Sequence, residues 1–594
     1  MNVIESCKQL KEKPWFSNYF LPLLCSILSG TAFSAFLGIN TSNFFSLIFL
    51  LLLCPLYRNT LAIREKKLVL VSSVCGFLLT IFCIFGRIRN FLENNELWKN
   101  IALLIGFFLF FRSCLMWIYQ KISRIECNTD KVPNKKKKKL IFFGSSGIML
   151  LAWLPYFIYM FPGVMTTDSN WQMKQALGID AYSNHHPIMH TVIIKLFYSV
   201  GGFLFKGNAN LAVATYSVCQ AILLSMAFAY LILTLYEFGF RKSVLIAVLL
   251  SYALPSYHAL YSITMWKDIW FGGIVLALST TLWRILVHSK TGKKKIHLSE
   301  FIMFFIFGIS MCLFRSNGLY AFVLLILFMT VYFVRQKNYA IILNAVVALV
   351  VALIVKGPVY NAIGVTPVDT IESLSIPAQQ IAAAVRDGAE LTEEQSSLLN
   401  EIVDVSALGE RYSPNISDSI KNLVRETDNQ EYLNEHKFEF LKLWIDLGIR
   451  NPKSYLIAHV EQTFGYYYPD VQYWIYGLGI DANGLEGISH NDETCPAFLR
   501  SLMEKCKDAY RKYPYLGLFW SIGMATWGIL FTAGAVFLRK QKSYLLIFVP
   551  VIGVLFTLMI ATPVFAEFRY AYSFFTTLPL LFTLPFCNEE KISS

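Results

Sequence analysis

Residues 188–205, IMHTVIIKLFYSVGGFLF, form the apolar stretch whose placement decides the topology of this chain. The stretch is long enough to cross a membrane, but it contains His190 and Lys195 and ends near Gly201 and Gly202. Polar residues within an otherwise apolar helix are typical of an amphipathic helix that lies in the membrane interface. If the stretch crossed the membrane instead, every loop after it would change sides.

The basic residues of the later loops discriminate between these two placements, because short cytoplasmic loops are rich in Lys and Arg. With an interfacial stretch the later basic clusters all lie inside, and with a spanning stretch they all lie outside. The clusters are Arg241 and Lys242, Lys290 and Lys293–Lys295, Arg335 and Lys337, and Arg539, Lys540 and Lys542. The charge rule therefore favours the interfacial placement.

The composition is that of a polytopic membrane protein. Of 594 residues, 55% are hydrophobic and only 15% are charged, so the chain is more apolar than a soluble domain of this size. Residues 356–513 contain 14 Lys/Arg against 24 Asp/Glu, which leaves 38 and 15 for the rest of the chain. The excess positive charge thus lies in the short loops between apolar stretches, where it indicates which side of the membrane each loop occupies. We therefore expect no nucleic acid partner. Disordered, fibrous, disulfide-rich secreted and ordinary cytosolic classes are excluded.

We predict an all-α polytopic membrane protein with about 14 transmembrane helices. The expected spans lie at about 18–38, 42–57, 67–86, 99–119, 140–161, 210–235, 243–262, 269–287, 299–314, 319–334, 339–355, 514–537, 543–562 and 570–586. Both termini are then cytoplasmic.

The chain is expected to have four parts. Residues 1–139 hold the first helices and a Lys-rich cytoplasmic loop, and residues 140–355 form a transmembrane catalytic module with an external loop at 162–209. Residues 356–513 form a mostly helical extracytoplasmic domain, and residues 514–594 hold the last helices. Cys495 and Cys506 could form a disulfide in the external segment.

Under this topology polar residues beside the spans gather at the outer membrane face. Ionisable groups at membrane depth are costly, and several together usually line a site or a pathway. For any single residue the alternative is an interfacial anchor. The residues are Asp168, Gln172, His185, His186, Lys267, Asp268, Arg315, Asn317, Glu567 and Arg569.

The segment Phe161 to Asp168, FPGVMTTD, turns out of a span and places a carboxylate just above the bilayer. A carboxylate there can accept the proton of an attacking hydroxyl, or it can bind a divalent cation such as Mg²⁺ or Mn²⁺. Alternatively, Asp168 only caps the helix that follows.

His186 and His190 are four residues apart, so both could face one side of a helix and bind zinc. Two histidines do not complete a zinc site, and no Glu follows the first His as in a zinc hydrolase motif. We favour hydrogen bonding to a substrate or a phosphate, and interfacial packing is the alternative.

Lys267, Arg315 and Arg569 come from three separate span ends, an arrangement that suits one lipid-linked phosphate or pyrophosphate. Alternatively, Arg569 forms a purely structural ion pair with Glu567 and does not bind a phosphate.

The pattern of residues around Asp168 and the following amphipathic stretch resembles that of the GT-C superfamily of polytopic glycosyltransferases. These enzymes use polyprenyl-phosphate sugars and include protein mannosyltransferases and aminoarabinose transferases. The resemblance is specific over about residues 155–235. It is carried by an external loop with Asp168 and Gln172, by His185-His186-Pro187 before an amphipathic helix, and by the end of that helix at Phe203–Gly207. In that family the corresponding helix lies along the membrane. The whole chain is also similar to a group of bacterial multi-span proteins without an assigned reaction, which share a stretch like Ile376–Ile381.

The resemblance implies an inverting glycosyltransferase of the bacterial plasma (inner) membrane. It would transfer a sugar from an outward-facing polyprenyl-phosphate carrier to an envelope glycan, glycolipid or protein. Asp168 would be the general base, Gln172 and His185 would position the acceptor or the sugar, and the three cations would stabilise the leaving phosphate. The family often has a second acidic residue beside its first aspartate, whereas Thr167 and Ser169 flank Asp168, so a metal-binding carboxylate pair is not matched.

Three other functions are alternatives, although the transporter fits least, because the polar residues gather at one face and no repeated half is evident in the sequence. A polysaccharide polymerase or ligase would use lipid-pyrophosphate donors. A lipid or solute transporter would have ionisable residues near the bilayer midplane and broken helices in paired halves. A scaffold for envelope assembly would need no chemistry at all.

Overall fold

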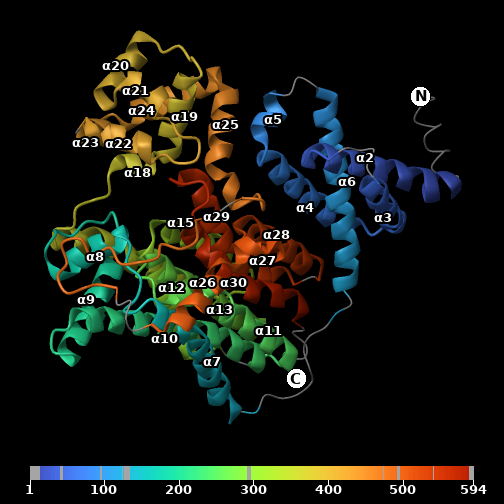
Figure 1. Ribbon diagram of the computed structural model, residues 1–594. Coiled ribbons are helices and arrows are strands. Elements are labelled where there is room, and N and C mark those ends of the chain that lie inside the picture. Colours follow the sequence, from blue (N-terminus) through green and yellow to red (C-terminus); the bar gives the residue numbers. More distant parts are fainter. Residues whose placement is uncertain are drawn as a thin grey trace. The chain divides into compact units, whose positions relative to one another are not determined.

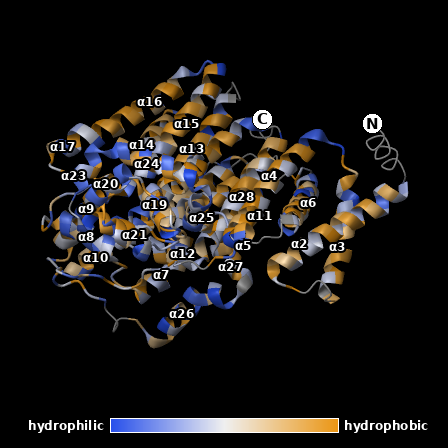
Figure 2. Cartoon of the chain, turned by 90° about the horizontal axis from the view of Figure 1, so that it is seen from above, coloured by the Kyte–Doolittle hydropathy of each residue, from blue (hydrophilic) through white to orange (hydrophobic). Residues whose placement is uncertain are grey.

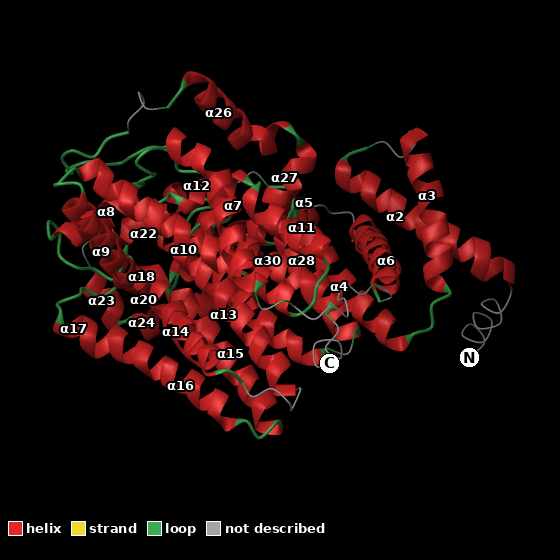
Figure 3. Ribbon diagram, turned by 90° about the horizontal axis from the view of Figure 1, so that it is seen from below, coloured by secondary structure: helices red, strands yellow, loops and turns green. Residues whose placement is uncertain are grey.

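The computed structural model describes residues 14–39, 44–93, 97–123, 125, 134, 136–290, 296–427, 429–471, 474–490, 495–539 and 541–587. The expected cytoplasmic termini, 1–13 and 588–594, lie outside this part, as do Lys293–Lys295 and Lys540. The described residues form helices joined by loops, as Figure 3 shows, and their only extended pairing consists of isolated β-bridges. The predicted all-α class is confirmed.

The chain divides into two compact units. The first comprises Met1–Ile125 and Trp527–Lys542, and the second comprises Glu126–Thr526 and Ser543–Ser594. The predicted C-terminal part, 514–594, is thus divided between the two units.

The first unit is a group of apolar helices. Close approach of two of them depends on Gly106, where a Cβ would overlap the carbonyl oxygen of Leu28. The Ser29 hydroxyl donates to the Gly106 carbonyl at 2.8 Å, which satisfies a polar group between the same helices. The helices are α2 (Leu21–Leu37), α3 (Phe44–Leu61), α4 (Lys66–Phe85), α5 (Ile88–Glu93), α6 (Leu97–Ile122) and most of α28 (Ile522–Leu538).

The second unit is built around α13 (Lys267–Lys290), which packs against α10, α14 and α30. Of its apolar window 83% is buried, the highest share among the candidate spans of the described residues. The other helices of this bundle are α7 (Lys137–Tyr159), α8 (Thr167–Leu177), α9 (Ile188–Leu204), α10 (Ala209–Glu237), α11 (Lys242–Ala253), α12 (Ser256–Ser262), α14 (Leu298–Phe314), α15 (Ser316–Arg335), α16 (Tyr339–Ile354), α29 (Val549–Ala561) and α30 (Tyr572–Thr583).

Nine helices of the described residues are long and apolar enough to cross a membrane, or ten if one bent pair is a single span. Figure 2 shows hydrophobic residues along α15 and α16, whereas α26 (Ala497–Lys512) is mainly hydrophilic. This is the architecture of a multi-pass membrane protein.

Two expected spans are interrupted. The expected helix at 243–262 is bent by 59° between α11 and α12, at Leu254 and Pro255. Proline lacks the amide hydrogen that the helix needs and disfavours the helical conformation of the residue before it. The expected helix at 514–537 is broken at Ser521, which has an extended backbone between α27 (Pro514–Trp520) and α28.

Residues 370–463 fold into a cluster of short helices with its own apolar core, which Figure 1 shows beside the bundle of the second unit. The core contains Ile381, Leu399, Leu423 and Leu443, all buried. The later cysteines Cys495 and Cys506 are both free thiols. The helices are α18 (Thr370–Ser373), α19 (Ser375–Arg386), α20 (Glu393–Ile402), α21 (Val405–Arg411), α22 (Asp418–Glu426), α23 (Gln430–Glu435), α24 (Lys437–Arg450) and α25 (Pro452–Thr463).

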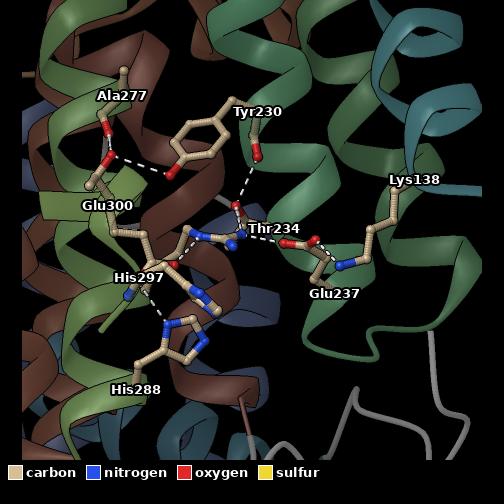
Figure 4. A network of polar contacts seen from close by, with 10 residues as sticks. Lys138, Tyr230, Thr234, Glu237, Ala277, His288, His297 and Glu300 are labelled. Atoms are coloured by element: carbon tan, nitrogen blue, oxygen red, sulfur yellow. Dashed lines mark hydrogen bonds and ion pairs between the residues drawn. The ribbon is translucent and has the colours of Figure 1, made fainter. Parts of the chain in front are cut away.

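A buried ionic network joins four helices at the end of α13 that carries Arg284 (Figure 4). The Arg284 guanidinium donates to Glu237 of α10 and, at 2.9 Å through Nε, to Glu300 of α14. Lys138 of α7 pairs with Glu237 at 2.5 Å, and His288 Nδ1 lies 2.9 Å from Glu300 Oε2. Because buried charges must be paired, this network fixes the four helix ends relative to one another.

We expect Arg284→Ala to lower the free energy of unfolding by about 3–5 kcal/mol, because Glu237 and Glu300 would lose their shared buried partner. The apparent melting temperature of the purified protein in detergent would report this loss. Lys138→Ala is the matched control, since the Lys138 side chain is 39% exposed and the Arg284 side chain only 14%. Equal losses for both variants would contradict the central role of Arg284.

Candidate functional site

The segment just before α8 is fixed by backbone pairing with two distant segments. Val164 pairs with Thr264, and Met165 pairs with Ile480. The chain reaches this position through Gly163, whose φ of +146° is rarely adopted by other residues and where a Cβ would collide with the Ser217 hydroxyl. Asp168 therefore follows a short segment held on both sides.

The cap of α8 is formed by Thr166 and Ser169, not by Asp168. The Thr166 amide donates to the Ser169 hydroxyl at 3.1 Å, and Ser169 in turn donates to the Met265 carbonyl at 2.8 Å. The Asp168 carboxylate is therefore available for other contacts.

Asp168 pairs with an arginine from the far end of the chain. Arg569 Nη1 donates to Asp168 Oδ2 at 2.5 Å, and Arg569 Nε lies 3.1 Å from Glu567 Oε1. The Asp168 side chain is 32% exposed, whereas those of Arg569 and Glu567 are 15% and 10% exposed. Asp168 is thus the accessible member of this group.

The first turn of α13 brings two more charges to the same place. Asp268 accepts a hydrogen bond from Arg315, the single extended residue between α14 and α15. Lys267 Nζ donates to His186 Nδ1 at 2.7 Å and interacts electrostatically with Asp168 and Arg569. Three cations and three carboxylates from four segments of the chain thus form one charged cluster: Asp168, Lys267, Asp268, Arg315, Glu567 and Arg569.

Aromatic rings hold the two guanidinium groups of this cluster. Arg315 lies over the Tyr570 ring at 4.7 Å, and Arg569 lies over the Trp266 ring at 5.0 Å and the Tyr570 ring at 5.3 Å. Such cation–π contacts orient the guanidinium planes and are strongest away from water.

Asp168 and Glu567, the two carboxylates that contact Arg569, have different proton affinities because their surroundings differ. Burial favours the protonated form of Asp168, but the positive charges of Arg569 and Lys267 outweigh it and hold the pKa of Asp168 below its usual range. Burial raises the pKa of Glu567 to about 7, only partly opposed by Arg569 and reinforced by the charges of Asp268 and Asp168. Around neutral pH, Asp168 is ionised and Glu567 changes its charge.

The two histidines beside the cluster are neutral at neutral pH. Partial loss of hydration lowers the pKa of the exposed His185, burial lowers the pKa of His186, and the charge of Lys267 lowers both further. Since Lys267 donates to His186 Nδ1, the proton of the neutral His186 ring belongs on Nε2.

Gln172 and His190 lie in a separate, buried chain of hydrogen bonds. Gln172 Oε1 is 2.8 Å from His190 Nδ1, and His190 Nε2 is 2.7 Å from the Tyr216 hydroxyl, which also bonds to Gln220 and Trp270. This chain ties α8 and α9 to α10 and α13. Asn317 is half-buried in the first turn of α15, two residues after Arg315.

The carboxylates of the charged cluster do not fit a divalent cation as they are arranged. Asp168 and Asp268 each accept a hydrogen bond from an arginine, and Glu567 faces Arg569. Among the described residues no group of three His, Cys, Asp or Glu side chains is placed to hold a metal.

An apolar pocket of about 330 Å³ is lined by the turns of α13 that follow Lys267 and Asp268. Its α13 wall is Ile269, Trp270, Gly273, Ile274 and Ala277. Helices α7, α10 and α14 supply the other walls, including Phe142, Leu224, Tyr230 and Phe307. The size is at the lower end of the range for small-molecule sites, about 300–1,000 Å³.

Sequence reasoning missed the aromatic residues of the site. Tyr570 follows Arg569 directly, and Trp171 is three residues after Asp168, so helix periodicity would have placed Trp171 on the same face. Trp266 directly precedes Lys267, but its partners Arg569 and Thr166 are distant along the chain and could not be predicted.

Residues 180–593 match DUF6020, which is described as a family of unknown function. The matched range includes Lys267, Arg315, Glu567 and Arg569, while Asp168 lies just before it. No curated protein and no solved structure matches the chain. Because the match covers well over half of its length, the chain belongs to the DUF6020 family.

Proposed function

We propose that this protein is a membrane glycosyltransferase that transfers a sugar from a polyprenyl-phosphate carrier to a hydroxyl of an envelope glycan, glycolipid or protein. The observation that carries the proposal is that one helix, α13, contributes Lys267 and Asp268 of its first turn to the charged cluster and lines an apolar pocket with the turns that follow. A ligand with a phosphate and a long hydrocarbon chain matches both at once. The phosphate would bind the cations, and the first part of the chain would lie along Ile269 to Ala277.

Unsatisfied atoms support a polar ligand at the cluster. Asp268 Oδ2 and His186 Nε2 are buried and have no hydrogen-bond partner among the described residues. Leaving buried polar atoms unpaired is costly, and such atoms in a native protein call for an explanation. A phosphate oxygen would accept from His186 Nε2, and a ligand hydroxyl would donate to Asp268.

The three carboxylates differ in their exposure to solvent, so we assign them different roles. Asp168 is the accessible one, at 32% exposure of its side chain against 1% for Asp268 and 10% for Glu567. It would accept the proton of the acceptor hydroxyl as that oxygen attacks the anomeric carbon and the bond to the phosphate breaks. Lys267, Arg315 and Arg569 would stabilise the charge that the departing phosphate gains.

The proposal includes a GT-C-like topology with 14 spans. Nine long helices and the bent pair account for ten, and α3, α14, α28 and α30 would supply the other four. Helix α9 would lie in the interface, since His190, Thr191 and Ile194 are buried while Val192, Leu196 and Phe203 are exposed. The Arg284 network, about 24 Å from Asp268 along α13, would then lie near the opposite membrane face and not at the midplane that a transporter would use.

We expect Asp168→Asn to reduce sugar transfer at least about 100-fold, because the asparagine keeps the shape but cannot accept the proton. The measurement is an envelope glycan profile by mass spectrometry of a null strain complemented with wild type or variant at matched membrane levels.

Asp180→Asn is the matched control, since Asp180 is an exposed aspartate just after α8 and outside the cluster. It should restore the wild-type profile. Normal transfer by Asp168→Asn would remove Asp168 from the reaction, and an unchanged profile in the null strain would overturn the transferase proposal.

Binding of the anionic donor should weaken as the pH rises from 6 to 8. Below the Glu567 pKa of about 7 the cluster has three cations and two carboxylates, and above it the third carboxylate is charged. We expect a loss on the order of tenfold, since an added charge near the phosphate opposes binding by up to a few kcal/mol. Farnesyl phosphate methyl ester, a phosphodiester that does not titrate in this range, is a suitable probe in nanodiscs.

Glu567→Gln removes the titrating charge and should make this binding independent of pH, at or above the affinity of wild type at pH 6. A pH profile that survives in Glu567→Gln would assign the effect to another group.

A further inference from the structure

Two exposed tryptophans lie beside the charged cluster. In the second unit, Trp153, Trp266, Trp283 and Trp520 are buried, in line with the high average burial of tryptophan. Trp171 and Trp474 are instead 51% and 54% exposed. Among the described tryptophans of this unit they are the most exposed, and both adjoin residues of the cluster.

Trp171 lies on α8, three residues after Asp168, so the two side chains share a face of the helix. Its ring centroid is 6.1 Å from those of His185 and His186. His186 contacts Lys267, and His185 is exposed. Trp171 therefore lies beside the two histidines that adjoin the cluster at Lys267.

Trp474 lies at the glutamate end of the cluster, because its backbone forms a bridge with Glu567. A Cβ added at Gly477 would meet both the Trp474 ring and the methyl group of Thr166, the residue that caps α8. The loop around residues 474–477 is thus held against the segment that leads to Asp168.

We propose that Trp171 and Trp474 form the subsite for the pyranose ring of the donor. This inference rests on the proposed function for its choice of ligand. The sugar of a polyprenyl-phosphate donor is joined to the phosphate through one oxygen, so it must lie at the exposed edge of the cations that bind the phosphate. The C–H faces of a pyranose pack against the electron-rich faces of aromatic rings. His185, exposed beside Trp171, supplies ring nitrogens for the sugar hydroxyls.

The test compares two ligands of equal charge in nanodiscs by isothermal titration calorimetry. One is farnesyl phosphoryl β-glucose, and the other is farnesyl phosphate methyl ester, which has no sugar. Wild type should bind the glucosyl ligand more tightly. Trp171→Ala and Trp474→Ala should each weaken that ligand about three- to tenfold and leave the methyl ester unchanged. The Phe variants should retain most of the affinity, since a phenyl ring still stacks.

Trp98→Ala is the matched control, because Trp98 is 67% exposed in the first unit. It should change neither affinity. Equal binding of the two ligands by wild type, or equal losses for both in the Ala variants, would overturn the sugar subsite while leaving phosphate binding in place. If wild type binds neither ligand, the proposed function falls and the subsite falls with it.

Discussion

The pairing of buried charges is the constraint on which the rest of this structure depends. Lys267, Arg315 and Arg569 gather where an unpaired charge would cost several kcal/mol, so each needs a partner close by. Asp168, Asp268 and His186 supply these partners from other segments. The pairs therefore hold together chain segments that are up to 401 residues apart in sequence.

The balance of charges also explains why one carboxylate differs from the others. Asp168 and Asp268 each accept a direct hydrogen bond from an arginine, which stabilises the ionised form. Glu567 is buried among both aspartates and shares Arg569 with Asp168, so its ionised form is the least stabilised. The three cations and three carboxylates of the cluster would have a net charge of zero if all were ionised. Glu567 is the one member that gains or loses a proton near neutral pH.

Much of this arrangement follows from the sequence, because the charge rule and hydropathy are properties of the chain itself. The assignment of residues 188–205 to the interface placed Asp168, Lys267, Arg315 and Arg569 at one membrane face, and the structure brings these four together. Which cation meets which carboxylate depends on the packing of α13 against α14 and α30, and no local pattern encodes it. Gln172 and His190 could not be separated from the cluster either, since their burial depends on Tyr216 of α10.

Interruptions in the helices were also only partly predictable. Pro255 could have signalled the bend between α11 and α12, but hydropathy averaged over 20 residues hides a single proline. The break at Ser521 has a weaker marker, because serine is a common helix N-cap: its hydroxyl accepts from the Met524 amide of α28 at 3.2 Å and donates to the Pro469 carbonyl at 2.9 Å. A single serine within an apolar stretch is too common to predict a break on its own, and the contact with Pro469 comes from a distant part of the chain.

Helix α13 gives the second unit a mechanical property. Its first turn contains Lys267 and Asp268, its middle lines the pocket, and Arg284 lies more than four turns further on. An α-helix held by its own hydrogen bonds hardly changes length, so a shift of its first turn along the axis is passed on to the contact between Arg284 and Glu300. The charged cluster and the Arg284 network, at the two ends of α13, are thus mechanically coupled through the helix.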